Sequence, residues 1–292
     1  MSRTPPQTLP TDRPRPCPVF DAMALASIVI PTYNQAAYLP ACVDRCLFQT
    51  HPELEIIIVD GGSTDATKAY LDALPGHIAT AAAEPVVRMD ADGQVVRERV
   101  LTYPQNRRLS IVRFETDIGP TRTYNEGLAR ATGEYCTFIP GDDLPYPHMI
   151  EELAAALARS GADFAYADQD VLEDDGRIYR RMTFPEFDMK ACLAEWYHLG
   201  VCRLYRRRLH ETVGLMDEAY TSANDYDHYL RFAMAGATFV HVPRVLYGVR
   251  RHGPARPTGQ HTPTRYANLL AESCRLATRA REFLDSKDTA AP

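Results

Sequence analysis

The chain has 292 residues, a formal net charge of −6 and a composition ordinary for a soluble globular protein. This length can bury a full hydrophobic core, as one large domain or as one domain with appendages. The negative charge argues against a general nucleic-acid binder. No apolar run reaches the roughly 18 residues that a membrane-spanning helix needs, although peripheral membrane contact through an amphipathic helix stays open.

The N-terminal segment lacks the apolar core of a secretory signal, so we expect no signal peptide. Residues 1–22 are rich in Pro, Thr and Arg and are expected to form a disordered leader. The seven cysteines are scattered and odd in number, which does not indicate a disulfide framework. A reducing, cytoplasmic location is therefore favoured, and peripheral attachment to the inner face of the membrane stays open.

The first half of the chain alternates short apolar runs with helical periodicity. The predicted strands are 26–30, 55–59, 109–114, 135–139 and 163–167, and the predicted helices are 38–49, 65–74, 120–131 and 149–157. This order predicts an α/β fold with a mostly parallel sheet covered by helices on both faces. Residues 76–108 interrupt it and are expected to form an inserted loop or hairpin.

The pattern changes after Asp168. The expected elements are a hairpin over 168–190, a helix over 225–234, a strand over 239–242, a linker over 253–264 and an amphipathic helix over 266–284. The apolar side of that helix is predicted to carry Leu269, Leu270, Cys274 and Leu276. The basic run 203–208 is interpreted as a solvated face, with nucleic acid or anionic lipid as the less favoured alternatives.

Two acidic clusters each follow a predicted buried strand. They are Val59-Asp60-Gly61-Gly62-Ser63-Thr64-Asp65 and Phe138-Ile139-Pro140-Gly141-Asp142-Asp143. In an open α/β sheet, ligands bind where such strands end. Asp142 and Asp143 cannot both cap a helix, since none is predicted before Pro147. Mg²⁺ or Mn²⁺ takes one or two carboxylates together with phosphate oxygens; a surface turn is the alternative.

The loops after the first two strands are candidates for nucleotide binding. Gly61 and Gly62 allow close backbone approach, and Asp60 could accept a hydrogen bond from a uracil or ribose group. The alternative is a turn in which residues 63–65 only cap a helix. The loop after the first strand consists of Pro31, Thr32, Tyr33 and Asn34. Its backbone and Thr32 are expected to line a base pocket, with Tyr33 beside the base.

Taken together, these motifs resemble glycosyltransferase family 2 with the GT-A fold. The matching stretches are 30–34, 59–65, 131–135, 141–143, 214–218 and 224–231, within roughly residues 26–252. The resemblance implies a Rossmann-like, mostly parallel sheet with a C-terminal acceptor-side segment and helix. It also implies a nucleotide-sugar-binding half at 23–168 and an acceptor-binding, catalytic half at 169–252, followed by the linker and helix of 253–292.

The resemblance also implies roles for the acidic residues. Asp60 would bind the base or ribose, Asp142 the ribose or the metal, and Asp143 the Mn²⁺ or Mg²⁺ ion. Asp225 matches the catalytic base, which takes the proton of the incoming hydroxyl in an inverting transfer through an oxocarbenium-like transition state. The alternative is that Asp225 is only a helix-start carboxylate favoured by the helix dipole.

Further residues are implied on the donor and acceptor sides. Asp117 and Arg122 would border the donor sugar or its phosphates, with a surface salt link as an equal alternative. Arg250 and His252 would close over the diphosphate, for which arginine is well shaped. The acceptor-side candidates are Trp196 and His198; Trp196 could stack on a sugar or belong to the core.

Three positions depart from the family pattern. Gly61 stands where many members have a second Asp that contacts uracil, so the base preference is open. Asn224 stands where Glu is frequent, and Pro140 where many members have Asp or Asn. None of these changes removes the candidate metal carboxylates or the candidate base.

The sequence therefore predicts a metal-dependent glycosyltransferase. It would move a sugar from a nucleotide-diphospho-sugar, most often UDP-linked, to a hydroxyl acceptor such as a glycan, a lipid-linked sugar or a small molecule. The alternatives are a nucleotide-sugar hydrolase, a nucleotidyltransferase (whose Gly-rich phosphate loop is missing after the first strand) and an inactive binding module. Polysaccharide or glycolipid assembly is the commonest setting of relatives, and secondary-metabolite glycosylation competes with it. The oligomeric state is not specified.

Overall fold

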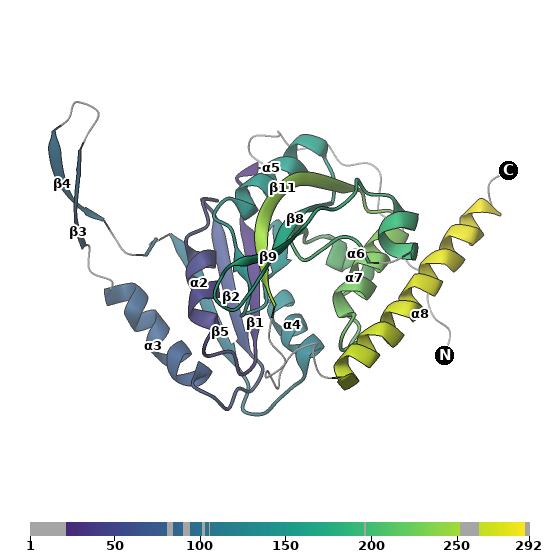
Figure 1. Cartoon of the computed structure of the whole chain (residues 1–292), viewed down its shortest axis with the longest axis horizontal. Helices are drawn as coiled ribbons and strands as arrows, with labels where there is room; N and C mark the ends of the chain where they lie inside the picture. Colours follow the sequence, from purple (N-terminus) through teal and green to yellow (C-terminus); the bar gives the residue numbers. More distant parts are fainter. Residues whose placement is uncertain are drawn as a thin grey trace.

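The computed structural model describes residues 22–80, 84–89, 94–100, 103–104, 106–195, 197–251 and 263–289 (Figure 1). Its strands are β1 (Ala26–Thr32), β2 (Leu54–Asp60), β3 (Glu84–Met89), β4 (Val95–Val100), β5 (Arg107–Arg113), β6 (Tyr135–Phe138), β7 (Leu144–Pro145), β8 (Phe164–Leu172), β9 (Ile178–Met182), β10 (Arg203–Arg206) and β11 (Phe239–Arg250). Its helices are α2 (Leu39–Leu47), α3 (Thr67–Thr80), α4 (Pro120–Leu128), α5 (Met149–Ser160), the π-helix η1 (Lys190–Glu195), α6 (Leu209–Val213), α7 (Asn224–Met234) and α8 (Pro263–Asp288).

The main sheet has the order β5-β2-β1-β6-β10-β8-β11-β7, with β9 paired to β8. β5, β2, β1 and β6 are parallel, as the sequence predicts. β10 runs antiparallel between β6 and β8, and β8 is parallel to β11. β1, β2, β5, β6, β8 and β11 therefore end at the same edge of the sheet, which we call the rim, whereas β7, β9 and β10 run the other way.

Helices pack on both faces of this sheet because β1 and β2 are apolar on both sides. Ile28 and Ile30 face a core built with α2, α3 and α5. Val29 faces the opposite core, which includes side chains of α4, α6, α7 and α8. Each fully buried aliphatic side chain of this kind contributes roughly 1.5–3 kcal/mol, so both layers hold the rim in place.

The predicted interruption at 76–108 contains a separate two-stranded hairpin. β3 and β4 pair with one another and not with the main sheet. In Figure 1 the hairpin stands away from the rest of the molecule beyond α3, far from the side that carries α8. The insertion thus leaves the rim unchanged.

Two surface predictions were wrong. Arg203 and Arg206 are buried in β10, at 1% and 7% exposure, because the run between them is a central strand rather than a solvated face. On α8, Leu270 and Cys274 are exposed. The buried side of α8 carries Leu276, as predicted, together with Glu272, Ser273, Ala277 and Ala280.

Other predictions concern parts of the chain outside the described residues. This group consists of residues 1–21 of the expected leader, residues 253–262 of the expected linker, Trp196 and His252. None of the described helices combines the length and apolarity needed to cross a membrane. The six cysteines in the described ranges are free thiols.

Candidate active site

The ends of β1 and β2 bring Thr32 beside Asp60, which are paired in register and buried. Asp60 Oδ1 accepts the backbone N–H of Ser63 at 2.9 Å. Three other buried oxygens have no hydrogen-bond partner within the described residues: Asp60 Oδ2, Thr32 Oγ1 and Gln35 Oε1. Such oxygens are rare in folded proteins, and here they are suited to the polar groups of a ligand.

The two loops that follow these strands are tied together by Asn34. Its backbone N–H donates to Ser63 Oγ at 2.8 Å, and its Oδ1 accepts the N–H groups of Thr64 and Asp65 at 2.7 and 3.3 Å. Asp65 in turn accepts the N–H of Thr67 at 2.9 Å at the start of α3. Asn34 and Asp65 thus shape the loops, while Pro31 is buried and Tyr33 is half-buried beside them.

The second acidic loop lies on the other side of β1. The N–H of Gly141 donates to the carbonyl of Pro31 at 3.1 Å. A Cβ atom at Gly141 would lie 2.6 Å from Gln35 Oε1 and 3.2 Å from Thr32 Oγ1, so the absence of a side chain permits this approach. The two acidic clusters therefore flank the end of a single strand.

Asp143 is held from within the protein. It is 5% exposed, its Oδ2 accepts the Tyr247 hydroxyl and its Oδ1 accepts the backbone N–H of Arg250, both at 3.0 Å. Burial, and next the charge of Asp142, raise the pKa of Asp143 to about 8. Asp142 itself is half-buried at the rim.

The Arg250 side chain joins three segments of the rim. Its Nε donates to the carbonyl of Asp142 at 3.1 Å, and its Nη1 donates to the carbonyl of Asp174 at 3.0 Å. Its guanidinium lies 4.9 Å from the centre of the Tyr38 ring. Arg250 thus fastens the acidic loop to the β8–β9 turn and to the loop before α2.

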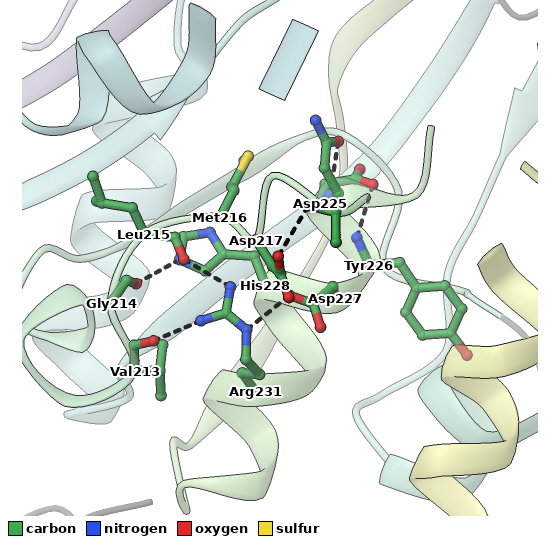
Figure 2. Close-up of polar contacts among 12 residues, drawn as sticks. Val213, Gly214, Leu215, Met216, Asp217, Asp225, Tyr226, Asp227, His228 and Arg231 are labelled. Atoms are coloured by element: carbon green, nitrogen blue, oxygen red, sulfur yellow. Dashed lines mark hydrogen bonds and ion pairs between the residues drawn. The ribbon is translucent and has the colours of Figure 1, made fainter. Parts of the chain in front are cut away.

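The candidate base, Asp225, lies in the first turn of α7. It is half-buried, and its Oδ2 accepts the Tyr197 hydroxyl at 3.2 Å. Its Oδ1 accepts the N–H of Tyr226 at 2.8 Å, a contact drawn in Figure 2. One side of this carboxylate therefore faces a tyrosine hydroxyl and not a cationic partner.

Asp227, two residues later, is occupied in another way. Its side chain is 1% exposed, and its two oxygens bind Arg231 at 2.7 Å and Arg279 at 3.0 Å. Arg231 also donates to the carbonyls of Val213 and Leu215, and Figure 2 shows this clasp around the loop before α7. Asp227 is therefore structural, which leaves Asp225 as the carboxylate of this helix suited to chemistry.

Tyr124 of α4 links the two acidic regions electrostatically. Burial raises the pKa of its hydroxyl most, and the charge of Arg203 opposes this rise. The charges of Asp225, Asp142 and Asp143 raise the pKa of Tyr124 further. All three carboxylates thus lie within electrostatic range of one half-buried side chain.

The remaining candidates lie at the surface or outside the described residues. Asp117 is exposed and its Oδ1 accepts the N–H of Gly119 at 2.8 Å. Arg122 is exposed and forms a long ion pair with Glu126 at 3.8 Å, which matches the surface salt link left open above. His198 is exposed. Trp196 and His252 lie outside the described ranges.

The 142–143 pair fits a hard divalent cation by its donor chemistry. Within the described residues, no three His, Cys, Asp or Glu side chains gather into a metal-binding group. Mg²⁺ and Mn²⁺, however, need only one or two carboxylates when phosphate and water complete the shell. Burial and the charge of Asp142 raise the pKa of Asp143, so a second negative charge is disfavoured here until a cation offsets it.

Several residues around the site were not identified from the sequence. They are Gln35, Arg203, Tyr247 and Glu272. For Arg203 a signal existed, because Val201, Cys202 and Leu204 form the apolar context of a buried strand. The others belong to no motif, and their roles arise from contacts across the fold.

Comparison with known proteins identifies the family. The model of "Glycosyl transferase family 2" matches residues 27–80 and 89–214. Glycosyltransferase GlyG of Streptococcus pneumoniae is 31% identical over 166 residues, 56% of this chain and 45% of that protein. A PGL/p-HBAD biosynthesis glycosyltransferase of Mycobacterium tuberculosis is 31% identical over 216 residues, 72% of this chain and 70% of that protein. The chain thus spans less than half the length of GlyG.

Solved structures share the fold. S. aureus TarS 1–349 in complex with UDP-GlcNAc matches with a TM-score of 0.62 and 18% identity, covering 87% of this chain and 66% of that one. Mannosyltransferase PcManGT from Pyrobaculum calidifontis, in complex with GDP-Man and Mn²⁺, matches with a TM-score of 0.53 and 18% identity, covering 99% and 80%. The predicted GT-A fold is confirmed, and the chain belongs to glycosyltransferase family 2.

Proposed function

We propose that the protein transfers a sugar from a nucleotide-diphospho-sugar to a hydroxyl-bearing acceptor, with inversion at the anomeric carbon. The observation that carries this proposal is the group of unpartnered buried oxygens at Thr32, Gln35 and Asp60, beside the adjacent carboxylates of the 142–143 loop. A base-binding pocket and a diphosphate-binding edge would then share the end of β1.

On the donor side, Asp60 would accept a hydrogen bond from an N–H of the base through its unpartnered Oδ2. Thr32 can donate its hydroxyl proton to a carbonyl of the same base. Uracil presents an N–H between two carbonyls, so a UDP-linked sugar is the first candidate. The TarS complex with UDP-GlcNAc supports a nucleotide-sugar as donor, and the PcManGT complex makes a GDP-linked sugar the competing one.

At the metal edge, Asp143 would hold Mg²⁺ or Mn²⁺ with Asp142 beside it. The ion would neutralise the charge of the leaving diphosphate. The Tyr247 hydroxyl and the Arg250 N–H keep the Asp143 carboxylate in a fixed orientation. Arg250 also holds the loop itself through the carbonyl of Asp142.

On the acceptor side, Asp225 would act as general base. Its carboxylate takes the proton of the acceptor hydroxyl while the hydroxyl oxygen bonds to the anomeric carbon. The bond from that carbon to the diphosphate oxygen breaks, and its electron pair leaves with the nucleoside diphosphate. Asp227 cannot take this role, because Arg231 and Arg279 occupy its oxygens.

Thermal shift with a panel of nucleotide-sugars, each with and without Mn²⁺, tests the donor assignment. At a ligand concentration of about 100 Kd, binding stabilises the folded state by about 2.7 kcal/mol, a rise of several degrees in Tm. We expect this rise with one nucleotide-sugar and Mn²⁺, its loss in Asp143→Ala and its retention in the control Asp175→Ala, an exposed carboxylate.

No rise with any nucleotide-sugar, or an equal rise in Asp143→Ala, would contradict the donor assignment. Product analysis with and without a hydroxyl acceptor then separates transfer from hydrolysis. A hydrolase would use the same donor residues with water in place of the acceptor. It would release free sugar at a rate that does not respond to added acceptor.

A further inference from the structure

Arg203 is a buried cation in the middle of the sheet. It is 1% exposed, and its guanidinium lies 3.9 Å from the centre of the Phe138 ring and 5.3 Å from that of Tyr229. Its Nε has no hydrogen-bond partner in the described part of the chain. An apolar side chain of similar volume would pack here without the desolvation penalty, so the presence of Arg203 calls for a role beyond packing.

Arg203 is connected to the candidate base through the Gly200 carbonyl and the Tyr197 hydroxyl. Its Nη1 donates to the carbonyl of Gly200 over a long 3.5 Å. The Tyr197 hydroxyl lies 3.0 Å from the same carbonyl and 3.2 Å from Asp225 Oδ2. The Gly200 carbonyl and the Asp225 carboxylate are thus two acceptors for one hydroxyl.

A hydroxyl has a single proton and donates it to one acceptor at a time. Burial, and next the charge of Asp225, raise the pKa of Tyr197 well above its usual value. Tyr197 therefore keeps its proton and acts as donor. The Gly200 carbonyl oxygen has two lone pairs, so a cationic donor such as Arg203 does not block it but draws its electron density and makes it the weaker of the two acceptors.

We propose that Arg203 is a positioning residue for Asp225: by donating to the Gly200 carbonyl, it leaves the Tyr197 hydroxyl proton to Asp225. That hydrogen bond fixes Oδ2, while the N–H of Tyr226 fixes Oδ1. The carboxylate is then held in one rotamer with lone pairs left for the acceptor hydroxyl. The inference rests on the proposed role of Asp225 as base.

We call the path from Arg203 through the Gly200 carbonyl and the Tyr197 hydroxyl to Asp225 the relay. Steady-state kinetics of Tyr197→Phe, Arg203→Met and the double variant tests it. We expect each single substitution to lower kcat about tenfold, which is about 1.4 kcal/mol, with the donor KM within twofold. Because both substitutions break the same relay, the double variant should lose no more than the singles. Arg203→Lys should recover part of the loss.

The matched control is Tyr146→Phe, which removes a tyrosine hydroxyl that donates to Asp170 at 3.1 Å, outside this relay. It should leave kcat unchanged. Arg203→Met should also keep or raise Tm, since it replaces a buried charge by an apolar side chain. Additive losses, near a hundredfold in the double variant, or unchanged kcat in both singles would overturn the relay.

A second measurement needs no activity. 3-Fluorotyrosine placed at position 197 reports the partner of its hydroxyl through its ¹⁹F resonance. We expect this resonance to shift in Arg203→Met and in Asp225→Asn, but not in Glu282→Ala, an exposed carboxylate. If the ¹⁹F chemical shift is the same in both variants as in the parent protein, the relay is overturned. A resonance that responds in a protein that transfers no sugar upholds the relay and overturns the proposed function.

Discussion

The carboxylate of Glu272 in α8 accepts the backbone N–H of Ala223 at 2.8 Å, directly before α7. It also accepts the N–H groups of Ser222 at 2.9 Å and Thr221 at 3.1 Å. α7 has no side-chain cap of its own at its N-cap residue. A buried carboxylate from another helix therefore binds the N–H of the N-cap residue, which a helix start leaves without an intrahelical partner, and those of the two residues before it, near the positive end of the helix dipole.

Replacement of Glu272 by Gln should lower both stability and activity. The amide keeps the size but loses the charge and one acceptor oxygen, which should cost about 1–3 kcal/mol. The turnover number should fall because the segment leading to Asp225 is held less firmly. Urea unfolding and initial rates measure the two effects. Glu282→Gln, exposed on the same helix, should change stability by less than about 0.5 kcal/mol; equal stability of the two variants would contradict this account.

Asp60→Asn should weaken nucleotide binding without destabilising the free protein. The amide can still accept the Ser63 N–H, but an NH₂ group would take the place of the unpartnered Oδ2. Loss of one charged hydrogen bond to the base, about 1.5–3 kcal/mol, corresponds to a Kd roughly 10–150-fold higher. Calorimetric titration with UDP measures it. Asp65→Asn serves as control, since it affects loop contacts; equal affinity losses in both variants would refute the assignment of Asp60.

Two aspartates on one helix should respond oppositely to the same change. Asp225→Asn should keep the Tm and donor affinity but reduce turnover at least a hundredfold, because it removes the proton acceptor. Asp227→Asn should lower stability by several kcal/mol, because it leaves Arg231 and Arg279 without their carboxylate. Near-normal turnover of Asp225→Asn would show that the base is another residue.

Acid should destabilise the contact between α6 and α7. Burial, and next charged neighbours, lower the pKa of His210 to about 4 and the pKa of His228 well below its usual value. Their rings stack at 5.3 Å. In the unfolded chain a histidine titrates near 6.5, so the unfolded state binds protons first as the pH falls. Stability is therefore full above about pH 6.5 and is lost below it.

Each histidine should contribute a slope of up to about 1.4 kcal/mol per pH unit in this window. Urea unfolding at pH 7.5, 6.0 and 5.0 measures the slope. In His210→Leu the slope should fall by up to about 1.4 kcal/mol per pH unit, since one neutral histidine is removed, while His51, whose pKa is also lowered by burial, keeps its contribution. An unchanged slope in this variant would place the acid sensitivity elsewhere.

The predictable part of this molecule is the part with a local signal. β1 and β2 are continuous apolar runs, as parallel strands covered on both faces require, and Asp60 and Asp142 follow directly from where such strands end. The hairpin within 76–108 could also be anticipated, since its Val-rich stretch interrupts the alternation of strand and helix.

The unpredictable part depends on contacts between distant segments. Tyr247 binds Asp143 across 104 positions of sequence, and Glu272 reaches Ala223 across 49. Neither has a motif, because a hydrogen bond between distant residues leaves no periodicity. The charge of the basic run predicts a surface position for Arg203, whereas the apolar residues around it form a buried strand. On α8, Glu272 occupies a buried position that hydropathy assigns to solvent.

Because Glu272 of α8 anchors the segment directly before α7, the order in which the ribosome synthesises the chain affects when this segment is held in place. The ribosome completes β1, β2 and the acidic loops long before residue 272 emerges, so a nascent chain can form a nucleotide pocket while the segment that carries Asp225 still lacks its anchor. Under the proposed chemistry, such a chain could bind a nucleotide-sugar but could not transfer the sugar to water or to a non-cognate alcohol. Acquisition of transfer activity would thus wait for α8.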